Sequence, residues 1–456
     1  MTDAGGAGSV TVLRGPAITC TDDPFLVGAE RAFRFESDAA VICRGGLIVA
    51  FGPYETLKAD IPPGASVSHY PDGLIAPGFV DTHVHYVQTG IIGAGGKPLL
   101  EWLESYTFAA EAAFADGDYA RQVAALFCDE LLRNGTTAAL VFCAVYPQSV
   151  DALFAEAARR NMRIAAGKVL MDRNAPDGLR DTAQTGYDQS RALIERWHGH
   201  GRCLYAITPR FAGSSSPEQL EAAGALWRAY PDVLVQTHIA ENRAEVTWVE
   251  GLFPERRDYL DVYDHYGLVG PRAVLAHGIH LSERAFCRCH EAGAALAHCP
   301  TSNLFLGSGL FRIAAAKDPR RPVEVGLGTD IGAGTSFSLL ATMGEAYKVA
   351  RLADQNLTAV EAFHLATLGG ARALGLDDRI GMLRAGHEAD VIVLDPRATP
   401  VLAFRTRQAR SIEEVLSVLM TMGEDRAIQA TYVAGRLAYA RPKVDHPPVA
   451  PHGPAQ

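Results

Sequence analysis

Two histidines separated by one residue follow a hydrophobic run near residue 80. The run spans residues 74–80, and His83 and His85 come next within PGFVDTHVHYVQ (77–88). Because side chains at positions i and i+2 of a strand point to the same face, both imidazoles would face one point beyond the strand. Neutral imidazole nitrogens are common metal ligands. The pair alone is a weak signal, since alternation in a half-exposed strand often brings two histidines together by chance.

Further polar residues follow three other hydrophobic runs. His238 and Glu241 occur in THIAEN, His277 occurs in AHGIH, and Asp330 ends GLGTD. Each has an ordinary explanation: a core histidine, a solvated carboxylate, or an aspartate that caps a helix. Taken together, however, three histidines and an aspartate form a donor set that suits Zn²⁺ or Fe²⁺ and leaves a position open for water.

The elements that must position these residues are eight hydrophobic runs alternating with amphipathic segments. After the first run, the others span residues 136–142, 164–171, 204–211, 233–240, 273–281, 294–300 and 323–330. Between them lie helical patterns such as 118–134, in which apolar residues recur at four-residue spacing. Continuously apolar strands joined by helices predict a parallel sheet buried on both faces. Eight such units predict an α/β fold, a (β/α)₈ barrel of the TIM type, with its functional site at the carboxyl ends of the strands.

Shorter alternating runs at both ends of the chain predict a second, smaller domain. We expect 1–72 and 379–441 to form a small β-sandwich-like domain and 73–378 to form the barrel. A helix is predicted over 358–375, beginning at a threonine cap. The tail 442–456 is rich in proline and poor in apolar residues, which predicts disorder.

Composition excludes several classes of function. The 456 residues carry a net charge of −10, which argues against a nucleic-acid surface. No apolar run is long enough to span a membrane, and no secretory signal is visible at the N-terminus. Eight scattered cysteines without a CxxC pair predict reduced thiols, and we expect a cytoplasmic protein with no membrane or nucleic-acid partner.

Other candidate ligands fit a metal site less well. Three strand residues follow Lys168, so we place it below the rim of the barrel, which favours one metal ion over a lysine-bridged pair. His298 and Cys299 lack a second Cys or His at ligand spacing, and Cys287 and Cys289 cannot face one ion from a helix. Four more histidines are expected to have no metal role: His280, His290, His364 and His387.

The arrangement resembles the amidohydrolase superfamily and, within it, the guanine deaminase family. The HxH pair, the histidines of the fifth and sixth strands and the aspartate of the eighth carry the first resemblance. The second is carried by stretches in order along the barrel. They are PGFVDTHVHYVQ (77–88), LLEWLESYTFAAE (99–111), GKVLMD (167–172), TPRF (208–211), HIAEN (238–242), AHCPTSNLFLGSG (297–309), GLGTDIGAGTSFSLL (326–340) and ATLGGARALGL (366–376).

The resemblance implies a hydrolase of purine catabolism that converts guanine to xanthine and ammonia. It implies one Zn²⁺ per chain, with Fe²⁺ as the alternative, and a homodimer. The implied metal ligands are His83, His85, His238 and Asp330. The zinc site would differ from that of the His/Cys/Cys deaminases, because the chain contains no PCxxC signature.

The resemblance also implies roles in catalysis. Asp330 would take a proton from the metal-activated water. Glu241 would pass protons to ring atom N3 and then to the departing amine, and His277 would orient or polarise the attacking hydroxide.

Substrate recognition is implied for residues that match the family's base-reading positions. Gln88 and Arg210 would face O6 and N7 of the purine, an edge that arginine also reads in DNA. Phe211 would stack on or flank the ring, and His238 and Glu241 would also line the substrate site. The ordinary alternative for Arg210 is a structural salt bridge.

Three alternatives to guanine deamination remain at this point. The chain resembles, more distantly, deaminases of related rings such as 8-oxoguanine or a pterin, and triazine hydrolases with the same metal frame. A barrel that serves only as a non-catalytic scaffold is the third. Scaffold relatives usually show substitutions among the ligands, whereas every expected position is filled here.

Overall fold

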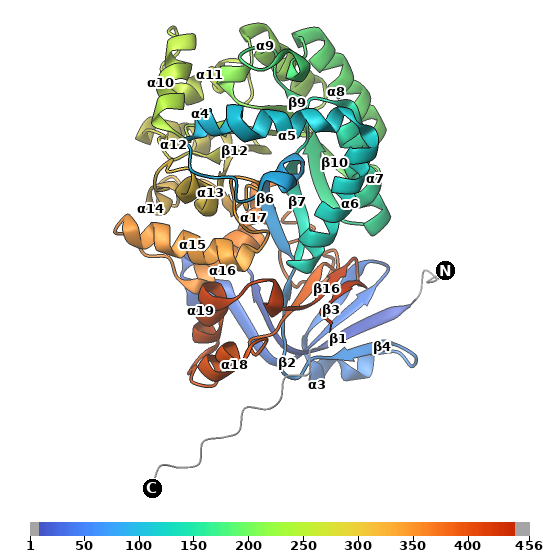
Figure 1. Cartoon of the computed structure of the whole chain (residues 1–456). Helices are drawn as coiled ribbons and strands as arrows, with labels where there is room; N and C mark the ends of the chain where they lie inside the picture. The colour runs from blue at the N-terminus through green and yellow to red at the C-terminus, as the bar shows by residue number, and fades with distance from the viewer. Residues whose placement is uncertain (1–8, 443–456) are drawn as a thin grey trace.

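The computed structural model describes residues 9–442, which form a barrel and an adjoining mixed sheet (Figure 1). The predicted disordered tail, 442–456, lies outside the described residues apart from Pro442. Within residues 9–442, no helix is both long enough and apolar enough to cross a membrane.

The barrel consists of eight parallel strands in the order β14-β13-β12-β11-β10-β8-β7-β6. Their bounds are β6 Phe79–His85, β7 Thr136–Phe142, β8 Arg163–Gly167, β10 Leu204–Pro209, β11 Leu234–Ile239, β12 Ala273–His277, β13 Ala295–His298 and β14 Val325–Leu327. The two end strands approach each other, because Thr82 Oγ1 donates to the carbonyl of Leu327 (2.9 Å) and Asp330 N donates to that of His83 (2.9 Å). The predicted TIM-type fold is therefore confirmed.

Burial explains why these segments form parallel strands. Every residue of β6, β7 and β8 is buried, as a sheet covered on both faces requires. The helices that cover the barrel are α6 Gly117–Arg133, α7 Pro147–Arg160, α8 Ala183–Trp197, α9 Pro217–Ala229, α10 Arg243–Leu252, α11 Tyr259–His265, α12 Glu283–Ala292, α13 Pro300–Phe305, α14 Ile313–Ala316, α15 Leu339–Leu352, α16 Ala359–Ala366 and α17 Leu368–Ala373.

The second part of the structure is one mixed sheet built from both ends of the chain. Its strands are β1 Val10–Cys20, β2 Phe33–Arg44, β3 Leu47–Pro53, β4 Ser66–His69, β5 Leu74–Pro77, β15 Val391–Leu394, β16 Ile428–Val433 and β17 Arg436–Ala440. Three short helices accompany it: α1 Pro24–Val27, α2 Ala29–Ala32 and α3 Tyr54–Leu57. Side chains from its N-terminal and C-terminal strands share one core, including Val41, Ile75 and Val393.

The sequence predicts that the first apolar run, residues 74–80, lies in one strand, but the structure divides it between two strands. Leu74–Pro77 forms β5, which pairs with β1 and β15 in the mixed sheet, and the barrel begins with β6 at Phe79. The predicted barrel start at residue 73 is therefore early. Gly78 marks the change between the two sheets: a Cβ there would lie 2.1 Å from Oγ1 of Thr137, so only glycine fits.

Other segments also differ from their predicted extents. The run 164–171 is interrupted at Lys168, between β8 and the two-residue strand β9 Val169–Leu170, which pairs with β10. The helix over 358–375 begins at the predicted Thr358 cap but is divided at Thr367 into α16 and α17. Two helices within 379–441 were not predicted, α18 Pro400–Thr406 and α19 Ile412–Met422, and α19 packs against α15 and α16.

One further segment bears on the site. Between β6 and α6, the chain forms α4 Leu99–Trp102, a π-helical turn (Leu103–Thr107) and α5 Phe108–Ala112. Figure 1 shows α4 and α5 crossing the barrel on the side away from the mixed sheet. This segment contributes side chains to the cavity described below.

Candidate active site

Three imidazoles and one carboxylate converge where β6, β11 and β14 end. His85 Nε2 lies 3.2 Å from His83 Nε2 and 3.1 Å from His238 Nε2. Asp330 Oδ1 lies 3.2 Å from His83 Nε2 and 3.3 Å from His85 Nε2. All four predicted metal ligands therefore offer one atom to the same small space.

The chemistry of this group fits a divalent cation. Burial lowers the pKa of all three histidines, that of His85 to about 4, so the rings are neutral. His238 Nδ1 donates to the carbonyl of Arg210 (2.6 Å), so its Nε2 carries a lone pair directed at the group. Ligands about 2.0–2.1 Å from a tetrahedral zinc ion lie roughly 3.3 Å apart, close to the spacings observed here.

Asp330 supplies the negative charge of the group. Burial opposes its ionisation, but the neighbouring imidazoles, His83 foremost, hold the pKa of this carboxyl well below its usual value. Its backbone lies in the left-handed region (φ 51°), as does that of His277 (φ 71°). Non-glycine residues rarely adopt this conformation, and such strain concentrates at functional sites.

Asp81, two residues before His83, forms hydrogen bonds that connect the first barrel strand to the segment after the eighth. Its carboxylate accepts hydrogen bonds from the backbone N–H groups of His83 (3.2 Å) and Thr329 (3.1 Å), and from the Thr329 hydroxyl (2.5 Å). These bonds hold Asp330 beside the HxH pair. The residue belongs to the DTHVH segment, but no pattern in the sequence indicates its partner 248 positions away.

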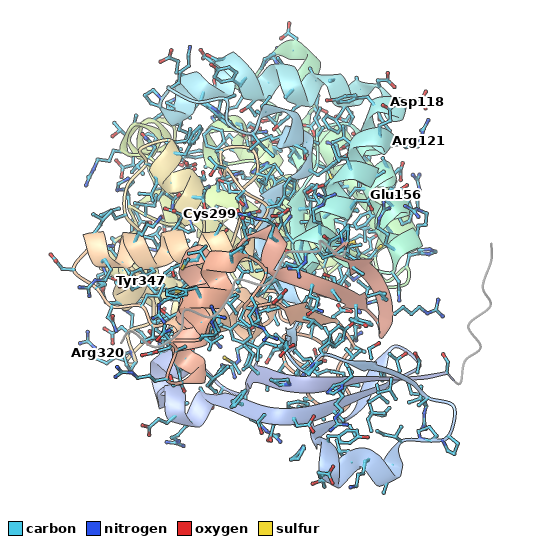
Figure 2. The ribbon with its side chains drawn as sticks, turned by 60° about the horizontal axis from the view of Figure 1, so that its bottom comes forward. Asp118, Arg121, Glu156, Cys299, Arg320 and Tyr347 are labelled. Atoms are coloured by element: carbon cyan, nitrogen blue, oxygen red, sulfur yellow. The ribbon has the colours of Figure 1, made fainter. Side chains whose placement is uncertain are left out.

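A thiol that was not predicted to bind the ion lies near the same space. Cys299 shares a second possible donor group with His83, His277 and Asp330, so the absence of ligand spacing in the sequence was no guide to its position. Cys299 is fully buried, whereas Figure 2 shows Arg121 of α6 at the edge of the molecule. Burial raises the pKa of this thiol well above its usual value, which keeps it protonated and a weak ligand.

Glu241 and His277 border the metal group on one side. Glu241 Oε2 lies 3.4 Å from His277 Nε2, and Asp330 Oδ2 lies 3.8 Å from the same nitrogen. Burial and the charge of Asp330 raise the pKa of Glu241 to about 8. A carboxyl group that is protonated near neutral pH suits proton transfer.

Two residues missed by the sequence analysis orient this pair. The Ser308 hydroxyl donates to Glu241 Oε1 (2.9 Å), and His277 Nδ1 donates to Asn303 Oδ1 (2.9 Å), which turns His277 Nε2 towards Glu241 and Asp330. Both lie in AHCPTSNLFLGSG, and only their hydrogen bonds in the folded chain distinguish them from the neighbouring polar residues.

The predicted base-reading residues also meet at this end of the barrel. Gln88 Nε2 donates to Glu111 Oε1 (3.0 Å), and Arg210 Nη1 pairs with Glu111 Oε2 (2.6 Å). Arg210 therefore does form a salt bridge, the ordinary alternative, but it does so while lining the same cavity as Gln88. Glu111, which is buried in α5, was not identified from the sequence.

One cavity joins the metal group to these residues. Its predicted polar lining comprises His85, Gln88, Arg210, His238, Glu241, His277 and Asp330. Phe211 lines it too, and Leu99, Leu100, Trp102 and Leu103 of the α4 segment close it with apolar surface. The remaining predicted metal ligand, His83, is buried and does not line the cavity. Apolar walls with a few convergent polar groups are typical of a site for a small planar ligand.

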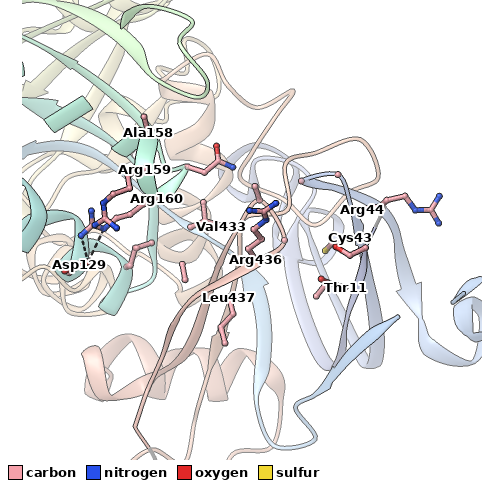
Figure 3. Close-up of a pocket in the computed structure, with 18 residues that line it drawn as sticks. Thr11, Cys43, Arg44, Asp129, Ala158, Arg159, Arg160, Val433, Arg436 and Leu437 are labelled. Atoms are coloured by element: carbon pink, nitrogen blue, oxygen red, sulfur yellow. Dashed lines mark hydrogen bonds and ion pairs between the residues drawn. The ribbon is translucent and has the colours of Figure 1, made fainter. Parts of the chain in front are cut away.

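A larger cavity lies elsewhere and contains none of these residues. It measures about 670 Å³ and lies between the mixed sheet and the end of α7, where Arg159, Arg160 and Arg436 line it. Figure 3 shows Arg160 turned towards Asp129, with which it forms an ion pair of 2.7 Å. The size of a cavity alone therefore does not locate the chemistry.

Lys168 does not face the metal group. Its Nζ lies 2.5 Å from Asp181 Oδ2 and donates to the carbonyl of Val169 (3.2 Å). The lysine is fully buried, and burial lowers its pKa. This arrangement agrees with the prediction of a site for one ion.

Comparison with known proteins points to one family. Residues 74–438 match the model of the amidohydrolase family. The chain is 51% identical over 439 residues to the guanine deaminase of Escherichia coli (strain K12), covering 96% of this chain and 99% of the other. The solved structure of E. coli guanine deaminase superimposes with a TM-score of 0.92, covering 95% of this chain and 100% of that one. A guanine deaminase from C. acetobutylicum, solved with guanine bound in its active site, is 28% identical, with a TM-score of 0.84, covering 94% of this chain and 100% of that one.

The buried pair of Lys168 and Asp181 provides a test for the number of ions. In Lys168→Met, Asp181 loses its cation, and we expect the free energy of unfolding to fall by about 3 kcal/mol. Metal content, measured by mass spectrometry, should stay at one ion per chain. The control Lys348→Met removes an exposed lysine and should change neither quantity. Two ions per chain in the unmodified protein, reduced by Lys168→Met, would contradict the one-ion site.

Proposed function

We propose that this chain, which belongs to the amidohydrolase family, catalyses the hydrolytic deamination of guanine to xanthine and ammonia. One observation carries the proposal. A single cavity is lined by members of the metal-ligand group, by Glu241 and by the Gln88–Arg210 pair. The similarity to the E. coli guanine deaminase, over nearly the full length of both chains, supports guanine as the substrate.

We propose zinc as the ion, held by His83, His85, His238 and Asp330. Three nitrogen donors and one oxygen donor at near-tetrahedral spacing suit Zn²⁺, with Fe²⁺ as the alternative. When bound, such an ion lowers the pKa of a coordinated water towards 7 and so makes hydroxide available at neutral pH. We also propose assembly as a homodimer and a place in purine catabolism from the resemblance, and a cytoplasmic location from the eight scattered cysteines.

The chain's own residues account for the proton transfers. Asp330 Oδ1 belongs to the ligand group, while Oδ2 faces His277 and is available to accept a proton from water. Glu241 carries a proton to ring atom N3 as the C2–O bond forms. Its carboxylate then takes the proton that the C2 hydroxyl loses as the C2 carbonyl forms and passes it to the amine, so the C2–N bond breaks and ammonia leaves. The proton held by Asp330 then returns Glu241 to its protonated form. His277, held by its hydrogen bond to Asn303, would turn Nε2 towards the attacking oxygen.

Residues on the cavity wall opposite Glu241 would bind and orient the base. Gln88 and Arg210 would donate to O6 and N7, the two acceptors of the purine edge away from N3. Phe211 would flank the ring, and the apolar side chains of the α4 segment would exclude water from the cavity. This places C2 and its amine towards Glu241 and the metal group.

The choice of substrate is tested by measuring ammonia release from four rings under identical conditions. These are guanine, 8-oxoguanine, isoxanthopterin and ammeline. We expect the highest kcat/KM for guanine, because the pocket pairs donors with O6 and N7 and closes the rest with apolar side chains. A rate higher by orders of magnitude for any of the other three would overturn guanine as the substrate.

The proton carrier is tested by Glu241→Gln. The amide keeps the shape of the side chain but cannot carry the proton, so we expect kcat to fall by about 10²–10⁴-fold with metal content unchanged. Glu250→Gln, an exposed position on the same side of the barrel on α10, serves as the control and should retain full activity. Undiminished ammonia release by Glu241→Gln would contradict the assigned role.

A further inference from the structure

Glu111 is a buried carboxylate that joins the two side chains proposed to read the base. It lies on α5 and is 1% exposed. One oxygen accepts from Gln88 Nε2 and the other from Arg210 Nη1, at 3.0 and 2.6 Å. Its two partners come from the turn after β6 and from the end of β10, so three segments distant in sequence meet at this carboxylate.

The partners of Gln88 fix the orientation of its amide. Gly332 N donates to Gln88 Oε1 at 3.2 Å, while Gln88 Nε2 faces the carboxylate. A carboxylate only accepts hydrogen bonds and a backbone N–H only donates. A flipped amide would therefore place oxygen against oxygen at Glu111 and N–H against N–H at Gly332. The second N–H of Gln88 Nε2 is thus held in a fixed place beside the cavity.

Glu111 also determines what Arg210 offers to the cavity. Within residues 9–442, the bond to Glu111 is the single side-chain hydrogen bond of Arg210, so its other N–H groups are available to a ligand. The carboxylate balances the buried guanidinium charge, and a neutral ring can enter without having to neutralise it. The wall therefore presents donors, without net charge, from both Gln88 and Arg210.

We propose that Glu111 is a positioning residue that gives the cavity its preference for a neutral ring with an acceptor edge, a carbonyl oxygen beside a ring nitrogen. The inference rests on the proposed function, since it concerns recognition of the 6-oxopurine edge. Glu111 itself acts through Gln88 and Arg210. Without the Glu111 carboxylate, the Gln88 amide is free to rotate and the Arg210 guanidinium is left unpaired.

The test compares two rings that differ in this edge and cannot be deaminated at C2. Hypoxanthine has the carbonyl oxygen and ring nitrogen but no 2-amine, whereas purine lacks the carbonyl as well. Binding to the zinc-loaded protein is measured by calorimetry. We expect the unmodified protein to bind hypoxanthine about tenfold or more tighter than purine, as a hydrogen bond to a charged donor allows.

In Glu111→Gln, an amide replaces the carboxylate and can accept from only one of the two partners. We expect the preference for hypoxanthine to shrink to about threefold or less, and KM for guanine to rise more than kcat falls. The matched control is Glu101→Gln, which removes the same charge from an exposed pair with Lys97 and should keep the full preference. Full zinc content in Glu111→Gln with an unchanged preference would overturn the inference.

A second variant guards against loss of the fold. Gln88→Met leaves the pair of Arg210 and Glu111 intact but removes the donor that Glu111 orients, so part of the preference should be lost. An unchanged preference in Gln88→Met would also overturn the inference. By contrast, an unmodified protein that releases no ammonia from guanine and binds both rings equally would refute the proposed function itself.

Discussion

The rest of the site depends on the close approach of three neutral imidazoles and one carboxylate at the barrel mouth. Nitrogen atoms bearing lone pairs lie 3.1 to 3.2 Å apart in a buried space, which is unfavourable unless a cation lies between them. The parallel barrel makes the arrangement possible, because it brings the ends of the first, fifth and eighth strands to one rim. The hydrogen bonds of Asp81 then hold Asp330 in place.

Arg210 connects the proposed metal site to the proposed base-recognition site. Its carbonyl oxygen accepts the Nδ1 proton of His238 and so directs the other nitrogen to the metal group. Its guanidinium, paired with Glu111, lines the cavity that faces the base. A single residue directly after β10 would thereby set the distance between the proposed metal site and the edge of the substrate that we propose is recognised.

Much of this site could be predicted because it follows from strand ends. His83, His85, His238, His277 and Asp330 each follow an apolar run, and parallel topology alone brings such positions together. Residues that act through hydrogen bonds across the barrel had no periodic signal: Glu111, Ser308 and Asn303. The fold differs from the prediction at β5, because this segment pairs with the mixed sheet and not with the barrel. It also differs at Lys168, where the predicted strand is interrupted by a residue in a buried ion pair.

We propose that one ion lies between His83, His85, His238 and Asp330. Anomalous diffraction from zinc-grown crystals, recorded at the zinc absorption edge, tests it most directly. We expect one peak per chain, about 2.0–2.2 Å from the three Nε2 atoms and from Asp330 Oδ1. The absence of a peak there, or a peak centred instead between His277 and Cys299, would contradict the account.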